Sequence, residues 1–327
     1  MFITIVIPTY NRAHLIRKTL KSLTEQNYPK ELYEILVVDN NSTDNTALVI
    51  NELSVNSGGI IKYIFEGRQG SHFARNCSVD HAKGDILYFT DDDMIADKNV
   101  LTAIAGIFEK YSDVGSVTGR VLPQWETEPP LWVKKYCTNG WLSLFDRDDE
   151  EYVSENDFGV FSCHQAVRKD LFIKAGGYNP DIVNGEWLGD NETGLNIKIK
   201  KTGYKFAFTG KAITFHMIPA TRMTQKYLNK RFANQGNCDS YTDYRANRFS
   251  NVELKRQNFL FAQLRMLRVV KFIGTRILNN DKWHIHRAYI NYFTTRIKYN
   301  IKLMKNKTWV EMVLIDDWIN KINEKYD

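Results

Sequence analysis

Three consecutive carboxylates, Asp91, Asp92 and Asp93, follow an apolar run at residues 86–89 that has the composition of a buried strand. Like charges packed at one strand end repel one another and lose hydration, so a nearby positive group is needed to stabilise them. A hard divalent cation with oxygen ligands would supply it. The alternative is a solvated acidic turn that caps the helix expected after it. The triplet therefore predicts either a metal-assisted ligand site or a helix cap.

Polar residues also end two other predicted strands. Pro8, Thr9 and Tyr10 follow the apolar run at residues 2–7, and Asp39 follows the run at residues 33–38. Because parallel strands present their carboxyl ends at one rim of a sheet, we expect these residues and the Asp triplet to share a nucleotide-type site. Taken alone, an Asp at the position of Asp39 is more often a helix cap. It is the convergence of three strand ends that favours ligand binding.

The elements that position these residues can be predicted from the sequence pattern. Short apolar runs alternate with segments of helical periodicity, which is typical of βαβ units and a mostly parallel sheet. We expect further strands at 60–65, 115–121, 158–167, 205–209 and 212–216, and helices at 13–26, 46–53, 74–81, 98–111, 169–175 and 193–202. The stretch from 123 to 157 looks irregular and long enough to be functional. From residue 221 onward the pattern is helical. The prediction is an α/β domain at 1–219 and a helical region at 220–327.

Composition is that of a globular protein, with 43% hydrophobic and 25% charged residues in 327. The four cysteines lack metal-site or disulfide spacing, which favours a reducing compartment. The first residues look like a strand rather than a signal peptide, and no run of 18 apolar residues occurs. We therefore expect a cytoplasmic protein.

The charge is divided unevenly along the chain. Residues 220–327 carry 21 Lys and Arg against 9 Asp and Glu, whereas residues 1–219 carry 23 against 29. Basic helices of this kind can pack on one another, can mediate oligomerisation, or can dock on an anionic membrane surface. No motif for nucleic acid accompanies the charge, so we expect no nucleic-acid partner.

Four motifs occur in order and at matching spacing: residues 6–12 (VIPTYNR), 35–44 (ILVVDNNSTD), 74–76 (ARN) and 88–93 (YFTDDD). Over roughly residues 1–217 the chain resembles the family 2 glycosyltransferases. The resemblance implies a GT-A fold, an inverting transfer of sugar from a nucleoside-diphosphate sugar, most simply a UDP-sugar, and dependence on Mn²⁺ or Mg²⁺. It fixes the reaction class better than the acceptor, which would be a glycan or a lipid-linked molecule in surface polysaccharide synthesis.

The resemblance also assigns roles to residues. Asp39 would recognise the base, and the triplet would be the family's DXD motif, with Asp93 as the main metal ligand and Asp91 or Asp92 holding the ribose or a metal-bound water. The remaining expected nucleotide contacts are Pro8, Thr9, Tyr10, Arg12 and Arg75, and the further metal ligands are Asp91 and His216. Arg75 could instead form a surface ion pair, and His216 could be an ordinary core residue.

An inverting transfer needs a carboxylate that removes the acceptor hydroxyl's proton. The family places a Glu-Asp pair before a helix that ends in Gly-Tyr, and counting back from Gly203 and Tyr204 puts Asn191 and Glu192 on that pair. Glu192 is thus the expected base, with Asp190 in reserve. Both could instead cap the following helix.

Two other functions remain open. A nucleotidyltransferase on a similar sheet would use the same carboxylates, but its first turn should be rich in glycine, and residues 8–11 contain none. A non-catalytic scaffold would use the basic helices and keep a vestigial cleft. Intact acidic residues at all the expected positions favour the enzyme.

Overall fold

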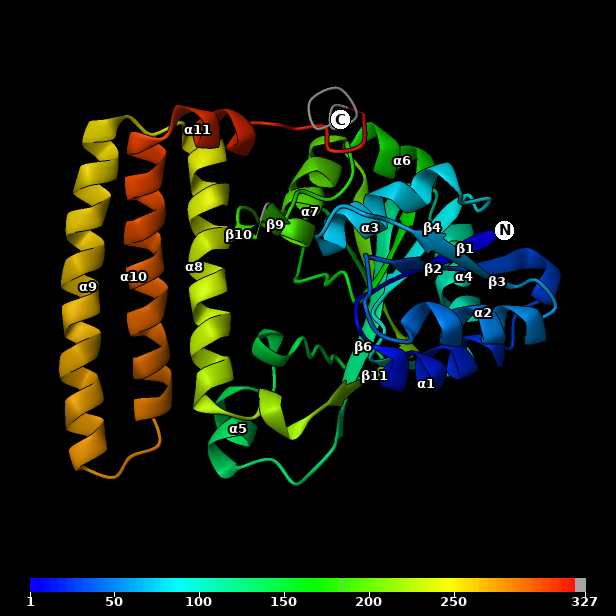
Figure 1. Ribbon diagram of the computed structural model, residues 1–327, viewed down its shortest axis with the longest axis horizontal. Helices are drawn as coiled ribbons and strands as arrows, with labels where there is room; N and C mark the ends of the chain where they lie inside the picture. The colour runs from blue at the N-terminus through cyan, green and yellow to red at the C-terminus, as the bar shows by residue number, and fades with distance from the viewer. Residues whose placement is uncertain (184, 321–327) are drawn as a thin grey trace.

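The computed structural model describes residues 1–183 and 185–320. Figure 1 shows an α/β body on one side and the long C-terminal helices on the other, joined to the body near both ends of those helices. The body is built on one large sheet, which has nine strands within the described residues. The expected α/β class with a helical C-terminal region is confirmed.

The sheet places the predicted strand ends beside one another. Its strands lie in the order β3 (Ile61–Phe65), β2 (Tyr33–Asp39), β1 (Ile3–Thr9), β4 (Ile86–Thr90), β8 (His164–Arg168), β6 (Val114–Trp125), β11 (Lys205–Ile218) and β5 (Met94–Ala96), and β7 (Glu151–Ser154) pairs with β11. Strand β1 is parallel to both β2 and β4, with Thr9 opposite Asp39 and Val6 opposite Phe89. The carboxyl ends of β1, β2 and β4 therefore meet at one edge, as the sequence predicted.

Helices cover both faces of the sheet. They are α1 (Ala13–Thr24), α2 (Thr46–Asn56), α3 (Ser71–Cys77), α4 (Val100–Lys110), α6 (Lys169–Lys174) and α7 (Asn191–Lys201). Helix α5 (Leu131–Tyr136) lies apart from these faces, and its Val133 belongs to a core cluster with Val121 and Ile218. Ile5 and Ile7 of β1 pack with α1 and α4, whereas Val6 packs with α3, α6 and α7. Because both faces are buried, these strands read as continuous apolar runs rather than as alternating ones.

The second half of the sheet differs in detail from the prediction. Strand β8 begins only at His164, not at 158, and runs antiparallel to both β4 and β6. The two strands expected at 205–209 and 212–216 are one strand, β11, with an irregularity between Thr209 and Ile213. Such a bulge accommodates extra residues without ending the strand. The stretch expected to be irregular contains the end of β6, α5 and β7.

The C-terminal helices are α8 (Gln225–Asn247), α9 (Asn251–Ile277), α10 (Trp283–Lys305) and the short α11 (Lys307–Val313). Helix α10 packs against both α8 and α9, and α9 lies farthest from the body in Figure 1. The antiparallel pair β9 (Ile182–Val183) and β10 (Glu186–Trp187) lies between α8 and the body. Within residues 1–183 and 185–320, no helix has the length and apolarity needed to cross a bilayer.

Candidate active site

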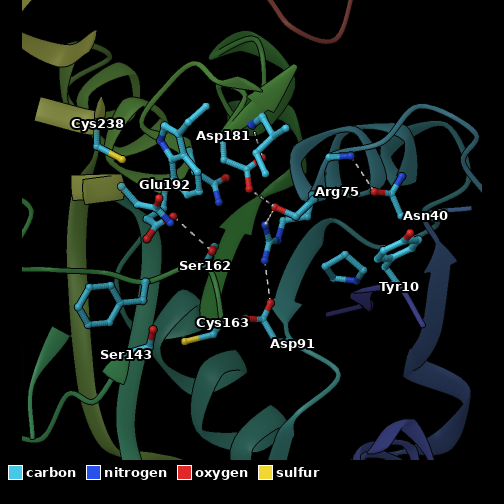
Figure 2. Close-up of a pocket in the computed structure, with 18 of the residues that line it drawn as sticks. Tyr10, Asn40, Arg75, Asp91, Ser143, Ser162, Cys163, Asp181, Glu192 and Cys238 are labelled. Carbon is cyan, nitrogen blue, oxygen red and sulfur yellow. Dashed lines mark hydrogen bonds and ion pairs between the residues drawn. The ribbon is translucent and has the colours of Figure 1, made fainter. Parts of the chain in front are cut away.

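A cavity of about 930 Å³ lies at the carboxyl edge of β1 and β4 and extends to α8. Ten of the twelve predicted site residues line it: Pro8, Thr9, Tyr10, Arg12, Arg75, Asp91, Asp92, Asp93, Asp190 and Glu192. Figure 2 shows Tyr10 and Asn40 on one side, Glu192 and Cys238 on the other, and the Arg75–Asp91 pair between them. Asp39 and His216 are not part of the lining.

Loop contacts build the wall on the Tyr10 side. Asn11 has a left-handed backbone (φ 53°), and its side-chain oxygen accepts from the backbone N–H of Thr43 at 2.7 Å, which ties the turn after β1 to the turn after β2. Asn40 donates to the backbone oxygen of Arg68 at 2.6 Å and accepts from the backbone N–H of Gly70 at 2.8 Å. These hydrogen bonds hold the turns after β1 and β2 in place, and the ring of Tyr10 is exposed beside them.

Asp39 lies just behind this wall and is buried. One carboxylate oxygen accepts from the backbone N–H of Ser42 at 2.9 Å, and the other accepts from the Tyr63 hydroxyl at 3.0 Å. Burial, together with the hydrogen bond to Asp39, raises the pKa of Tyr63 to about 12. The carboxylate is held firmly beside Asn40, and each of its oxygens keeps a lone pair free.

The three consecutive aspartates have three different partners. Asp91 accepts from Arg75 at 2.7 Å, Asp92 accepts from the Thr9 hydroxyl at 2.7 Å, and Asp93 accepts from Arg222 at 2.8 Å. Burial and the adjacent Asp93 charge raise the pKa of Asp92. Burial opposes ionisation of Asp93 as well, but His216 and Arg222 lower its pKa below the usual range. The triplet is therefore not a solvated turn, because Asp92 and Asp93 are both buried.

Asp93 and His216 offer an oxygen and a nitrogen donor 3.7 Å apart. The guanidinium of Arg222 bridges them, at 2.8 Å from Asp93 Oδ2 and 2.5 Å from His216 Nε2, while His216 Nδ1 lies 2.9 Å from the Leu142 carbonyl oxygen. Carboxylate and imidazole donors suit a divalent cation such as Mn²⁺. No set of three His, Cys, Asp or Glu side chains close enough to hold a metal occurs among the described residues. The protein alone thus supplies a partial ligand set.

Asp190 and Glu192 point in different directions because Asn191, between them, has a left-handed backbone (φ 43°). Asp190 is buried and accepts from Asn179 at 2.9 Å and from the Thr242 hydroxyl at 2.7 Å. Glu192 has one weak contact, 3.4 Å from the Ser162 hydroxyl (Figure 2). Burial raises the pKa of both carboxyls.

The side chains of Asp190 and Glu192 therefore have different surroundings. The Asp190 side chain makes no capping hydrogen bond to α7, and it joins α8 to the body through Thr242. Glu192 lies in the first turn of α7, where the helix dipole favours a negative charge, yet its carboxylate faces the cavity. Of the two, Glu192 is the carboxylate with fewer hydrogen bonds to other described residues.

Helix α8 forms a wall of the cavity that the sequence did not predict. Lys230, Arg231, Asn234, Gln235 and Cys238 line the cavity from this helix. Their spacing of one, three, one and three residues places polar side chains on one helix face, which is the signal that could have revealed them. The predicted boundary at residue 219 stays a prediction, but the cavity draws residues from both sides of it.

The sequence and structure of this chain are similar to those of known proteins. The model of "Glycosyl transferase family 2" matches residues 4–176. The chain is 44% identical over 215 residues to a dolichyl N-acetyl-glucosaminyl phosphate glucuronosyltransferase of Methanococcus voltae, covering 62% of this chain and 63% of that protein. It is 41% identical over 92 residues to the glycosyltransferase AglE of Haloferax volcanii, which covers 28% of this chain and 30% of AglE. The chain thus spans less than two thirds of either relative.

Solved structures share the fold. The mannosyltransferase PcManGT of Pyrobaculum calidifontis, in complex with GDP-Man and Mn²⁺, superposes with a TM-score of 0.61 at 18% identity, over 91% of this chain and 87% of that one. Residues 1–349 of Staphylococcus aureus TarS give a TM-score of 0.50 at 16% identity, over 92% of both chains. The fold is that of the GT-A glycosyltransferases. With a family match across more than half of its length, the chain belongs to glycosyltransferase family 2.

Proposed function

We propose that this protein is an inverting, metal-dependent glycosyltransferase that moves a sugar from a nucleoside-diphosphate sugar to a hydroxyl group. The observation that carries the proposal is a single cavity lined by the buried carboxylate of Asp93 and by the carboxylate of Glu192, which among the described residues is hydrogen-bonded to another residue only weakly, through Ser162. A donor held between them has its diphosphate at one wall and its anomeric carbon open to attack from the opposite wall.

On the donor side, the ring of Tyr10 stacks on the base, and the buried carboxylate of Asp39 supports the turn after β2 that forms this wall. UDP is our first choice of nucleotide, since TarS has been solved with UDP-GlcNAc, although PcManGT holds GDP-Man. Arg12, which lines the cavity beside the Asp triplet, and Arg222 contact the diphosphate, and Arg75 keeps Asp91 oriented toward the ribose.

Asp93 and His216 would hold Mn²⁺ or Mg²⁺, with Asp91 near enough to the diphosphate to assist. The bound cation would neutralise charge on the departing diphosphate. Such ions commonly take one or two protein ligands and fill the remaining positions with phosphate oxygens and water, which agrees with the partial ligand set.

In the transfer itself, the acceptor oxygen forms a bond to the anomeric carbon while the bond from that carbon to the diphosphate oxygen breaks. Glu192 removes the proton from the attacking hydroxyl, and the diphosphate leaves with the bonding electron pair. A raised pKa suits a general base, because a carboxylate with a higher proton affinity is a better proton acceptor. Asp190 stays a structural support that fixes α8 against α7.

A thermal-shift and calorimetric screen of nucleoside diphosphates, with and without Mn²⁺, tests the donor site. At least one nucleotide should raise the unfolding midpoint, more strongly with Mn²⁺, and Asp93→Asn should remove the Mn²⁺-dependent part. If no nucleotide binds to the wild-type protein under either condition, the proposed function is wrong.

For the acceptor, we propose a glycan or lipid-linked molecule reached from the cytoplasmic face of a membrane, with α9 as the contact surface. Four apolar side chains spaced seven residues apart, Val252, Phe259, Met266 and Ile273, are 50–68% exposed on this helix. Helix α9 also carries six Lys or Arg and one Glu. Apolar residues flanked by basic ones match an anionic lipid surface, whereas a second copy of α9 would bring like charges together.

Sedimentation with vesicles tests this surface. The protein should bind phosphatidylserine-containing vesicles but not phosphatidylcholine vesicles, and high salt should weaken the binding. Phe259→Ser should reduce it, while Val55→Ser, at an 84% exposed position of α2, should not. Self-association that Phe259→Ser abolishes, without vesicle binding, would contradict membrane docking and indicate a dimer surface.

A further inference from the structure

Helix α8 presents a basic and amide-rich stripe to the cavity. Lys230, Arg231 and Asn234 all line it, on the wall that also carries Glu192 and Cys238. Figure 2 places Glu192 and Cys238 away from Tyr10 and Asn40, across the Arg75–Asp91 pair. The stripe therefore lies on the side of the cavity opposite the wall we assign to the base of the donor.

Neither cation of this stripe forms a direct ion pair among the described residues. No carboxylate lies within 4 Å of Lys230 or Arg231 in that part of the chain, whereas Arg75 and Arg222 of the same cavity are each paired with an aspartate. Arg231 is held in place by two neutral groups, the backbone oxygens of Gly140 and Trp141, at 3.2 and 3.3 Å. Its charge acts on Glu192 at longer range and lowers the pKa of that carboxyl, against the larger effect of burial.

The amide of Asn234 is also uncommitted. Its side chain makes no hydrogen bond to other described residues, although it is partly buried in the cavity wall. Two unpaired cations beside a free amide are the groups that bind a phosphate, through charge-assisted and neutral hydrogen bonds. The donor's own diphosphate has other partners, since Arg222 and Asp93 lie together at the metal side of the cavity.

We infer that Lys230, Arg231 and Asn234 form a subsite for a phosphate group carried by the acceptor, next to the base Glu192. The inference rests on the proposed function and names its acceptor class, a hydroxyl-bearing molecule with a nearby phosphate. The phosphate could belong to a lipid carrier or to a polyol-phosphate chain, because both present the same anion. Binding there would hold the acceptor's hydroxyl within reach of Glu192.

Calorimetry on the enzyme saturated with UDP and Mg²⁺ tests the subsite, because the nucleotide then blocks the donor's diphosphate position. The probes are decyl phosphate, which represents a lipid carrier, and glycerol 3-phosphate, which represents a polyol chain. Lys230→Gln and Asn234→Ala should each weaken probe binding, Lys230→Gln by about tenfold as expected for one lost charge-assisted contact. Lys226→Gln, an exposed lysine on α8 outside the cavity lining, is the matched control and should change nothing.

The outcomes separate the two proposals. Tighter binding of decyl phosphate identifies a lipid source, and tighter binding of glycerol 3-phosphate identifies a polyol source; either supports the subsite if Lys230→Gln weakens it and Lys226→Gln does not. The inference is overturned if neither probe binds once UDP is present, or if both substitutions at Lys230 and Asn234 leave the affinity unchanged. UDP binding is measured first, in the same calorimeter cell. It tests the proposed donor site separately from the phosphate subsite.

Discussion

Replacing Glu192 by Gln keeps the shape of the side chain and removes its ability to accept a proton. Among the described residues, the Glu192 side chain makes one hydrogen bond to another residue, the weak one to Ser162 at 3.4 Å, so the substitution should lower the free energy of unfolding by less than about 1 kcal/mol. Loss of a general base typically slows a reaction by about 10²–10⁴-fold, or ~3–5 kcal/mol in the barrier. We therefore expect a folded, nucleotide-binding enzyme with almost no transferase activity.

Asp190→Asn is the informative comparison. The Asp190 carboxylate accepts two hydrogen bonds, from Asn179 and Thr242, and an amide can replace only part of them. Each hydrogen bond to a charged group contributes about 1.5–3 kcal/mol, so this variant should lose stability measurably in urea denaturation. Its activity at temperatures where it remains folded should fall much less than that of Glu192→Gln.

The assay is release of nucleoside diphosphate with acceptor present, measured across pH and alongside UDP affinity. Burial raises the pKa of Glu192, so wild-type activity should decline as the pH falls through that raised pKa, where the base becomes protonated. The residual activity of Glu192→Gln should lack this decline. The reasoning is refuted if Glu192→Gln keeps activity within about threefold of wild type while folded Asp190→Asn is inactive.

Three further predictions concern other parts of the site and its support. Arg222→Ala removes the guanidinium that bridges Asp93 and His216, so Mn²⁺ binding without nucleotide, followed by electron paramagnetic resonance, should tighten about tenfold; unchanged affinity would contradict the partial ligand set. Tyr10→Ala should weaken UDP binding by roughly 1–3 kcal/mol with no change in the unfolding midpoint, whereas Tyr10→Phe should bind UDP as tightly as the wild type. If Tyr10→Ala and the wild type bind UDP with equal affinity, stacking on Tyr10 is excluded. Burial lowers the pKa of His164 to about 4, so the unfolded chain takes up a proton before the folded one and stability should fall by ~3 kcal/mol as the pH drops from about 6.5 to 4; His164→Gln should lack that part of the slope in acid denaturation.

The sequence was sufficient for the central strands β1, β2 and β4 because each of them is buried on both faces. Ile5, Val6 and Ile7 are all fully buried, and continuous apolar runs of this kind are typical of central parallel strands. The second half was harder because its pairings are antiparallel and non-local. Strand β5 has three residues, too few for any periodicity, and β11 continues through a bulge that sequence reads as a turn.

The sequence predicted the site residues that lie at the ends of strands. It did not predict those that lie on helix α8. Asp93 and Tyr10 were found because strand ends converge by topology. Arg231 and Asn234 lie on a long helix whose opposite side packs on α10, and only the tertiary arrangement brings its polar stripe to the cavity. Likewise, nothing in the sequence shows that Asp190 is bound by Thr242, 52 residues away.

The stereochemistry of donor hydrolysis tests the central claim most directly, since water can replace the acceptor and no acceptor need be known. A donor such as UDP-α-N-acetylglucosamine is incubated with the enzyme and Mg²⁺, and the first anomer released is identified by proton nuclear magnetic resonance before it equilibrates. Direct displacement with Glu192 as the base predicts the β anomer from the α-linked donor, and no release by Glu192→Gln. Release of the α anomer, or undiminished release by Glu192→Gln, would contradict the account.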